Sequence, residues 1–83
     1  LNSAYPNPFN PTTTISYDLP KSSFVTISVY DITGKLVENL INENKEAGSY
    51  SIKWNASNIS SGIYLYRLVT NDFVSTKKLV LLK

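Results

Sequence analysis

The segment Phe24–Leu36, FVTISVYDITGKL, constrains the fold more than any other part of the chain. Between Phe24 and Tyr30, every second residue is apolar and β-branched: Val25, Ile27 and Val29. This period of two is typical of a β-strand with one buried face and one wetter face, and it excludes a helix. The fold must therefore supply a partner strand and a cover for the apolar face.

A turn sequence, Asp31-Ile-Thr-Gly34, follows this strand directly. An Asp side chain in such a turn accepts a hydrogen bond from the backbone two residues on, and a Gly adopts the positive φ that a tight reversal needs. The chain is expected to reverse here, and Leu36–Ile41 is expected to return as the partner strand. Because a lone hairpin is marginally stable in water, other strands must cover its apolar face.

Further strands are predicted wherever the same alternation recurs, and Pro20 ends the first of them. They are Thr12–Leu19, Ser49–Trp54, Gly62–Val69 and Phe73–Leu82. Gly62–Val69 is apolar on nearly both faces and is expected to be a central strand. Asn42–Gly48 is polar and is expected to be a mobile loop. The predicted core comprises Val25, Ile27, Val29, Ile52, Trp54 and the strand residues from Ile63 to Val69, with Trp54 as its anchor.

The Pro-rich segment Leu1–Pro11 carries three of the four prolines. It also contains Tyr5 and Phe9, which are expected to pack back on the strands because disordered linkers are poor in aromatic residues. If this segment pairs at a sheet edge, the strands number seven rather than six. With no helical period anywhere, the sequence predicts an all-β fold, an immunoglobulin-like antiparallel β-sandwich of six to seven strands. One domain is expected over residues 1–83, with the sandwich at 12–83.

Composition excludes several classes of function. The 83 residues include no Cys and no His, so disulfides, thiolate chemistry and the commonest general base and metal ligand are missing. The net charge of +2 is too weak for a nucleic-acid surface, and no apolar run approaches the ~20 residues of a membrane helix. We expect no cofactor and no catalytic activity. A chain that opens on Leu1 rather than Met is expected to be a piece of a longer protein.

Two other readings of the polar and aromatic residues are open. The carboxylates lie mostly in turns or at strand ends: Asp18, Asp31, Glu38, Glu43, Glu46 and Asp72. A catalytic pair would need two of them in one cleft, and a calcium site at Asp31 and Asp72 lacks the spacing of an EF-hand loop. The six Tyr residues with Trp54 would suit a sugar-stacking platform, although strand and core packing explains such residues as well.

Several short blocks stand in a fixed order along nearly the whole chain. They are Tyr5-Pro6-Asn7-Pro8-Phe9-Asn10-Pro11, Thr14–Pro20, Val29–Val37 with Tyr30, Asp31 and Gly34, Ala47-Gly48, Trp54-Asn55, Ser61–Tyr64 with Gly62 and Tyr64, and Lys77–Lys83. Together they resemble the C-terminal sorting domain of type IX secretion cargo, the Por secretion system sorting domain of type A. The immunoglobulin-like domain of the flagellar hook-capping protein is related, but the Lys-rich apolar strand that ends at Lys83 favours the sorting domain.

The resemblance implies a non-catalytic sorting signal on a larger cargo protein. That protein is expected to pass through the periplasm and to be secreted or carried to the cell surface. Its implied partners are the outer-membrane translocon, a sorting peptidase and an upstream cargo domain of the same precursor. The closing strand is expected at a sheet edge with backbone groups open on one side, which suits recognition. The predicted recognition residues are Lys77, Lys78, Leu79, Val80, Leu81, Leu82 and Lys83.

A second function is compatible with the same fold class. An immunoglobulin-like domain also serves as a structural or carbohydrate-binding accessory module of a secreted multidomain enzyme. A carbohydrate-binding module requires exposed, coplanar aromatic side chains, which the alternation of the strands does not supply.

Overall fold

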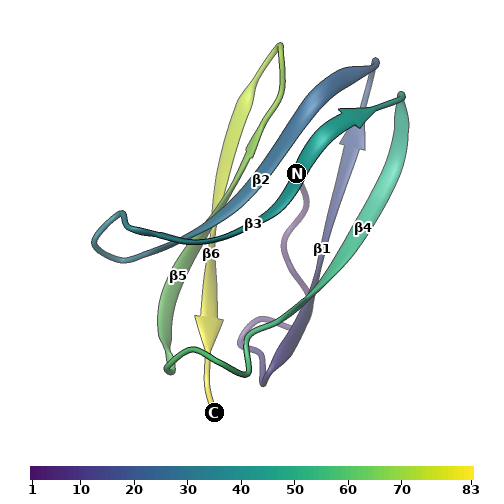
Figure 1. Cartoon of the computed structure of the whole chain (residues 1–83). Coiled ribbons are helices and arrows are strands. Elements are labelled where there is room, and N and C mark those ends of the chain that lie inside the picture. The colour runs from purple at the N-terminus through teal and green to yellow at the C-terminus, as the bar shows by residue number, and fades with distance from the viewer.

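The computed structural model describes residues 1–83 and contains six antiparallel strands in two facing sheets (Figure 1). The strands are β1 (Thr12–Leu19), β2 (Ser23–Asp31), β3 (Leu36–Lys45), β4 (Gly48–Asn55), β5 (Gly62–Val69) and β6 (Val74–Leu81). One sheet pairs β1 with β4, and the other has the order β3-β2-β5-β6. The fold contains no helix, so no helix in it is long and apolar enough to cross a membrane.

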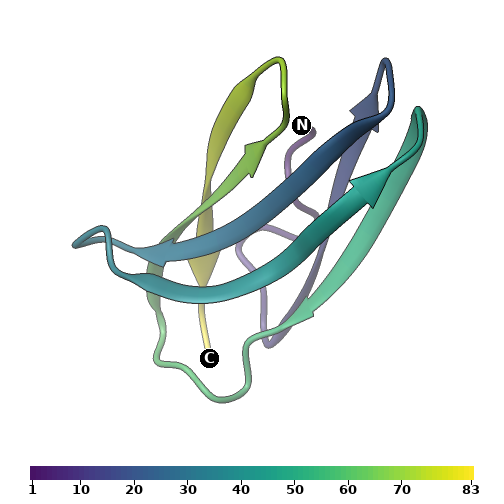
Figure 2. The same ribbon diagram turned by 45° about the horizontal axis from the view of Figure 1, so that its top comes forward.

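The strand order is that of an immunoglobulin-like sandwich, as predicted. Strands β3 and β4 are consecutive in the chain but belong to different sheets, so the chain crosses from one layer to the other at Glu46-Ala47 (Figure 2). The four-stranded sheet corresponds to the sheet of an immunoglobulin domain that has been extended by one strand at its edge. The Pro-rich segment Leu1–Pro11 is not a seventh strand, because it forms only two isolated bridges, Tyr5 to Thr14 and Phe9 to Leu81.

The core lies between the two sheets and follows the predicted alternation. On β1, Ile15, Tyr17 and Leu19 all face inward and are buried. On β2, the apolar series that begins at Val25 and ends at Val29 is completely buried. The sequence pattern of these two strands therefore defines their inner faces correctly, because each strand has one side against the opposite sheet and one side towards solvent.

Strand β5 is central, as predicted, with β2 on one side and β6 on the other. The prediction that all of Ile63–Val69 lies in the core is wrong for its outward residues. Tyr64, Tyr66 and Leu68 are buried, whereas Ile63 and Leu65 are 44% and 37% exposed. No third layer covers this face of the sheet, so an apolar residue that points outward stays in contact with water.

The predicted mobile loop Asn42–Gly48 is also wrong in most of its length. Strand β3 continues to Lys45 and β4 begins at Gly48, so only Glu46 and Ala47 connect them. The polar residues suit this edge strand, since Asn42 Oδ1 accepts a hydrogen bond from the hydroxyl of Thr26 on β2 at 3.1 Å. Two β-bulges interrupt the β2–β3 ladder, and bulges of this kind hinder pairing of an exposed edge with another chain.

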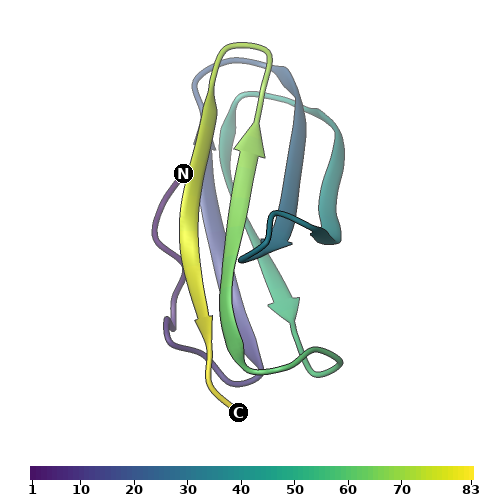
Figure 3. The same ribbon diagram turned by 90° about the vertical axis from the view of Figure 1, so that its left-hand side faces the viewer.

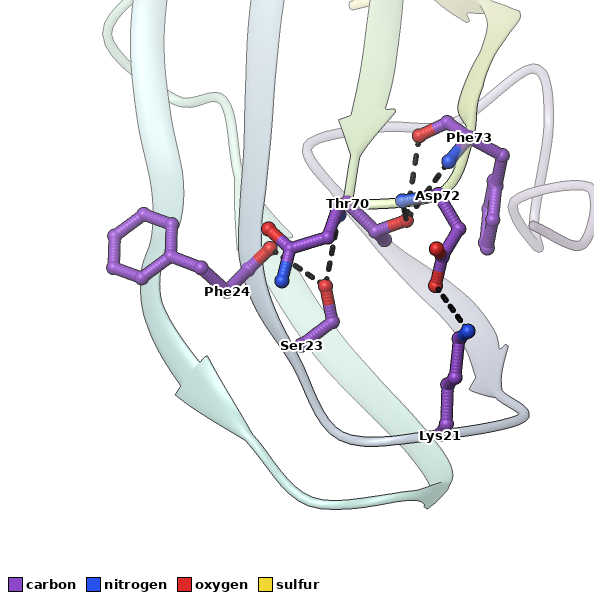
Figure 4. A network of polar contacts seen from close by, with 7 residues as sticks. Lys21, Ser23, Phe24, Thr70, Asp72 and Phe73 are labelled. Atoms are coloured by element: carbon purple, nitrogen blue, oxygen red, sulfur yellow. Dashed lines mark hydrogen bonds and ion pairs between the residues drawn. The ribbon is translucent and has the colours of Figure 1, made fainter.

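A polar network ties the β1–β2 connection to the β5–β6 connection at one end of the sandwich (Figure 4). The hydroxyl of Ser23 accepts from the backbone N–H of Asn71 at 2.9 Å, and the hydroxyl of Thr70 accepts from the backbone of Phe73 at 3.1 Å. Lys21 and Asp72 form an exposed ion pair at 3.5 Å. These contacts satisfy backbone N–H groups of the β5–β6 connection and hold it against the start of β2, which lies far away in the sequence.

Candidate functional site

The closing strand β6 is an edge strand of the four-stranded sheet, and its side chains alternate between core and surface. Leu79 and Leu81 point inward and have no exposed area. Lys78, Leu82 and Lys83 are exposed. Of the seven predicted recognition residues, the two buried leucines therefore stabilise the folded domain, and the exposed ones are available to a partner.

The outer edge of β6 is not open along its last residues, contrary to expectation. The side-chain amide of Asn7 donates from Nδ2 to the carbonyl of Lys78 at 3.0 Å. Its Oδ1 accepts from the backbone N–H of Val80 at 2.9 Å. One amide side chain thus satisfies a donor and an acceptor that a neighbouring strand would otherwise pair.

Phe9 continues this edge with its own backbone. Its N–H donates to the carbonyl of Val80 at 2.9 Å, and its carbonyl accepts from the N–H of Leu82 at 3.0 Å. The Phe9 ring is buried, as predicted, and packs against Trp54 with the ring centroids 5.7 Å apart. The Pro-rich segment therefore holds the end of β6 both by hydrogen bonds along the edge and by an aromatic anchor in the core.

The beginning of the same segment is fixed to β1, so it closes one side of the sandwich between the two sheets (Figure 3). Tyr5 exchanges backbone hydrogen bonds with Thr14 at 3.0 and 3.1 Å. This pairing turns the Tyr5 side chain outward, where it is 82% exposed, so the prediction that it packs on the sandwich is wrong. The inward positions are filled by Ala4 and Phe9 instead.

Tyr66 on β5 anchors the start of the Pro-rich segment from inside the core. Its hydroxyl accepts from the N–H of Ala4 at 2.9 Å and donates to the carbonyl of Asn2 at 3.0 Å. Burial raises the pKa of Tyr66, and the hydrogen bond from Ala4 opposes that rise. A phenol that has both a donor and an acceptor as partners costs little to bury, and this one positions the start of the Pro-rich segment.

Among the other residues of the Pro-rich segment, Pro6 and Pro11 accept hydrogen bonds, whereas Pro8 and Asn10 are exposed. The carbonyl of Pro6 accepts from the hydroxyl of buried Thr13 at 2.7 Å. The carbonyl of Pro11 accepts from the N–H of Ala56 at 2.8 Å, just beyond the end of β4. Pro8 and Asn10 are exposed and make no side-chain hydrogen bond.

The turn at Asp31 forms as the sequence predicts. Oδ1 of Asp31 accepts from the N–H of Thr33 at 2.9 Å, from its hydroxyl at 2.6 Å and from the N–H of Lys35 at 3.0 Å. The hydroxyl of Thr33, followed by the backbone N–H of Lys35, holds the pKa of the Asp31 carboxyl below its usual value. Gly34 has φ of 89°, a conformation that side chains other than glycine strain to adopt.

Trp54 and Tyr64 form the aromatic centre of the core. Their rings meet edge to face with centroids 6.4 Å apart. The indole Nε1 of Trp54 donates to Oε1 of Glu38 at 3.2 Å, and the hydroxyl of Tyr64 donates to the carbonyl of Ser60 at 2.7 Å. Gly62 is the first residue of β5, two positions before Tyr64, and has φ of 157°. These residues account for the fold and offer no free group to a ligand.

Lys83 is held by two serines of the β4–β5 connection, a contact that the sequence did not predict although Ser61 begins one of the blocks. The backbone N–H of Lys83 donates to Oγ of Ser61 at 3.0 Å, and its Nζ donates to the carbonyl of Ser57 at 2.7 Å. Short polar loops of this kind carry no pattern that names a distant partner, so only the folded structure identifies the contact.

The matching family is described as the secretion system C-terminal sorting domain, and the match covers residues 3–82. The chain belongs to this family. The resemblance predicted from the blocks is thereby confirmed. No match was found among curated proteins or among solved structures.

The sorting domain is a non-catalytic signal that directs a larger cargo protein into type IX secretion. Export to the cell surface or to the outside of the cell follows from that role. Within the sorting domain, Phe9, Trp54, Tyr64, Leu79 and Leu81 form one apolar cluster beneath the end of β6. Blocks far apart in the sequence therefore meet at one place in the structure, around the closing strand.

Proposed function

We propose that the outer-membrane translocon reads the folded sorting domain as cargo passes from the periplasm. The exposed side chains of Lys77–Lys83 form part of what it reads. This proposal rests on the arrangement at β6. The inner face of the strand packs in the core, and the Asn7 amide covers part of its outer edge. Lys78 and Leu82 remain for a partner, and Lys83 is exposed although its ammonium donates to the carbonyl of Ser57.

A sorting peptidase, the second proposed partner, acts on the chain that joins the cargo to this domain. The Pro-rich segment supports a boundary at that side, because its backbone is bonded to β1 and β6 and is thereby protected from cleavage. A peptidase that separates the cargo from the sorting domain is therefore expected to cut before Asn2, the first residue with a backbone hydrogen bond to the sandwich.

The domain itself has no catalytic activity in this proposal. The carboxylates are dispersed: Asp18 accepts from the hydroxyl of Ser49 at 2.7 Å, and Glu43 lies 3.3 Å from the ammonium of Lys45. No three potential metal ligands gather, and no pocket opens on the surface. These observations support a role that depends on surface recognition and not on turnover.

A carbohydrate-binding role has less support. Trp54 and the tyrosines of the core, Tyr17, Tyr64 and Tyr66, are buried. The most exposed aromatic side chain is Tyr5, which lies on the Pro-rich segment. A sugar ring stacks on exposed aromatic faces, and the domain presents no group of them in one plane.

The test uses a secreted reporter fused before Leu1 in a host that has type IX secretion. In one variant Lys77, Lys78 and Lys83 are changed to Gln. A matched control changes Lys21, Lys35 and Lys53 to Gln, so both variants lose the same charge. Surface changes of this kind shift stability by no more than ~0.5 kcal/mol. The proposal predicts that the reporter with the first variant stays in the periplasm while the control and the parent are exported.

Equal export of both variants would show that the lysines of the closing segment are not read. Failure of the parent domain to export the reporter would remove the proposal as a whole. Thermal unfolding of each purified variant serves as the folding control.

A further inference from the structure

The outward face of the four-stranded sheet carries an apolar patch that nothing in the chain covers. Strand register places Leu36, Tyr30, Leu65 and Lys78 in one row across β3, β2, β5 and β6. Ile63 on β5 and Val80 on β6 form the neighbouring pair, two residues along each strand from Leu65 and Lys78. Leu36 and Ile63 are 47% and 44% exposed. We define the outer patch as Tyr30, Leu36, Ile63, Leu65 and Val80.

A polar row of residues borders the outer patch on the same face. The next row joins Asn39, Ser28, Arg67 and Thr76, and the row after it joins Asn42, Thr26, Val69 and Val74. The outer patch thus lies at the end of the sheet that adjoins the Asp31–Gly34 turn, which projects from the sandwich (Figure 2), and the polar row separates it from Phe24, Val69 and Val74 at the other end. A concentrated apolar surface with polar surroundings is the usual anatomy of a protein interface.

The fold does not require the outer patch. The inner faces of β2 and β5 are formed by other residues of the same strands, such as Val29 and Tyr64, which are buried. Polar side chains at Ile63 and Leu65 would leave that core unchanged, because both point away from it. Yet these residues belong to strands that also contain sequence blocks typical of the sorting domain. Packing within the domain does not explain the apolar outward residues of β5, Ile63 and Leu65.

The charges beside the outer patch are basic. The guanidinium of Arg67 lies over the Tyr30 ring, 5.2 Å from its centroid, and Lys78 ends the first row. The outward residues of this sheet include no carboxylate by register. The nearby carboxylate of Asp31 is occupied by its own turn. A second copy of the domain, laid face to face, would therefore offer no partner for Arg67 or Lys78.

We propose that the outer patch docks on a protein surface of the secretion machinery that is apolar at its centre and carries carboxylates opposite Arg67 and Lys78. This inference rests on the proposed function and extends it, because it places most of the contact on β2, β3 and β5 and only its border on β6. The apolar residues supply contact area, and the two cations orient the partner and speed its approach.

The first experiment changes Ile63 and Leu65 together to Thr in the reporter fusion. Thr is β-branched and suits a strand, so the fold is expected to remain. The matched control changes Phe24 and Val74 to Thr, since these are exposed apolar residues of the same sheet that lie outside the outer patch. Loss of two apolar anchors is expected to lower the export rate about tenfold or more, with the control unchanged.

The second experiment leaves the apolar residues in place and reverses charge. Arg67→Glu with Lys78→Glu is compared with Lys21→Glu and Lys53→Glu, which change the net charge equally elsewhere on the surface. The inference predicts a loss of export for the first pair only. If the Thr variant does not unfold cooperatively when purified, this charge pair alone decides the question.

The outcomes separate the two proposals. If the parent domain exports the reporter and both outer-patch variants do so equally well, the inference is overturned while the proposed function stands. If the parent exports nothing, the proposed function is lost and the inference with it. If sedimentation shows that the parent is a dimer and that the Thr variant is a monomer, the outer patch is an interface between copies, which also overturns the inference.

Discussion

The side-chain amide of Asn7 takes the place of a neighbouring strand at Val80. It accepts from the Val80 N–H at 2.9 Å and donates to the carbonyl two residues earlier at 3.0 Å. An exposed strand edge is a template for pairing with other chains, and natural proteins cover such edges. In this sorting domain the cover comes from the Pro-rich segment, so the end of β6 is available to partners through its side chains and not through its backbone edge.

Replacing Asn7 by Ala is expected to weaken this cover. Two hydrogen bonds with a net value of about 0.5–1.5 kcal/mol each are lost, so the free energy of unfolding is expected to fall by about 1–2 kcal/mol. Hydrogen exchange at the Val80 amide is expected to accelerate as well. Asn10→Ala is the matched control, since Asn10 is exposed and makes no side-chain hydrogen bond. Equal exchange rates at Val80 in the two variants would contradict the role given to Asn7.

Trp54 is expected to be the most costly single residue to truncate. It is 2% exposed, packs against Phe9 and Tyr64, and donates its indole N–H to Glu38. Trp54→Ala is expected to cost about 3–5 kcal/mol, close to the whole stability of so small a domain. Tyr5→Ala, at an exposed aromatic residue, is the control and is expected to change stability little. A Trp54→Ala domain that melts within a few degrees of the parent would remove Trp54 from the core.

Two buried tyrosines are expected to respond in opposite ways to loss of the hydroxyl. The hydroxyl of Tyr17 is buried without a hydrogen-bond partner, so Tyr17→Phe is expected to leave stability unchanged or to raise it. The hydroxyl of Tyr66 binds Ala4 and Asn2, and Tyr66→Phe leaves both backbone groups unpaired. That variant is expected to lose about 1–3 kcal/mol. Urea unfolding of the two variants side by side measures the difference, and equal stability would refute it.

Alkaline pH is expected to destabilise the sorting domain through the same two residues. Burial raises the pKa of Tyr17, and of Tyr66, above the ordinary value of 10.0. Above that value the unfolded chain loses the phenolic protons first, so the free energy of unfolding falls as pH rises towards the folded pKa values. Below pH 10 the contribution is fully present.

The comparison that isolates this effect is urea unfolding between pH 8 and 11 for the parent and for the Tyr17→Phe, Tyr66→Phe double variant. The parent is expected to lose more stability over this range than the double variant does. Parallel curves for the two proteins would show that these two tyrosines do not cause any alkaline loss of stability.

Local sequence patterns predicted those features that depend on neighbouring residues. The alternation around Ile27 defined an inner face, and Asp31 with Gly34 defined a turn, because both signals lie within a few residues. The bonds from Asn7 to β6 and from Tyr66 to Ala4 join residues more than 60 positions apart. No local period encodes such a pairing, so these contacts became visible only in the folded chain.

The sequence was least informative where a residue type serves two structures. Asn42 and its polar neighbours suit a loop, yet they form the end of β3 because Ser23–Thr26 offer a ladder to pair with. Ile63 and Leu65 suit a strand buried on both faces, yet no layer covers their side of the sheet. Apolarity alone does not tell whether the domain itself or a partner covers a residue.

The central claim is that this domain is the sorting signal that directs its cargo into type IX secretion. The most direct measurement is the fraction of a reporter, fused before Leu1, that external protease removes from intact cells together with the fraction found in the medium. The reporter is expected outside cells that have the translocon and inside cells that lack it. Equal amounts outside both strains, or retention inside both, would contradict the claim.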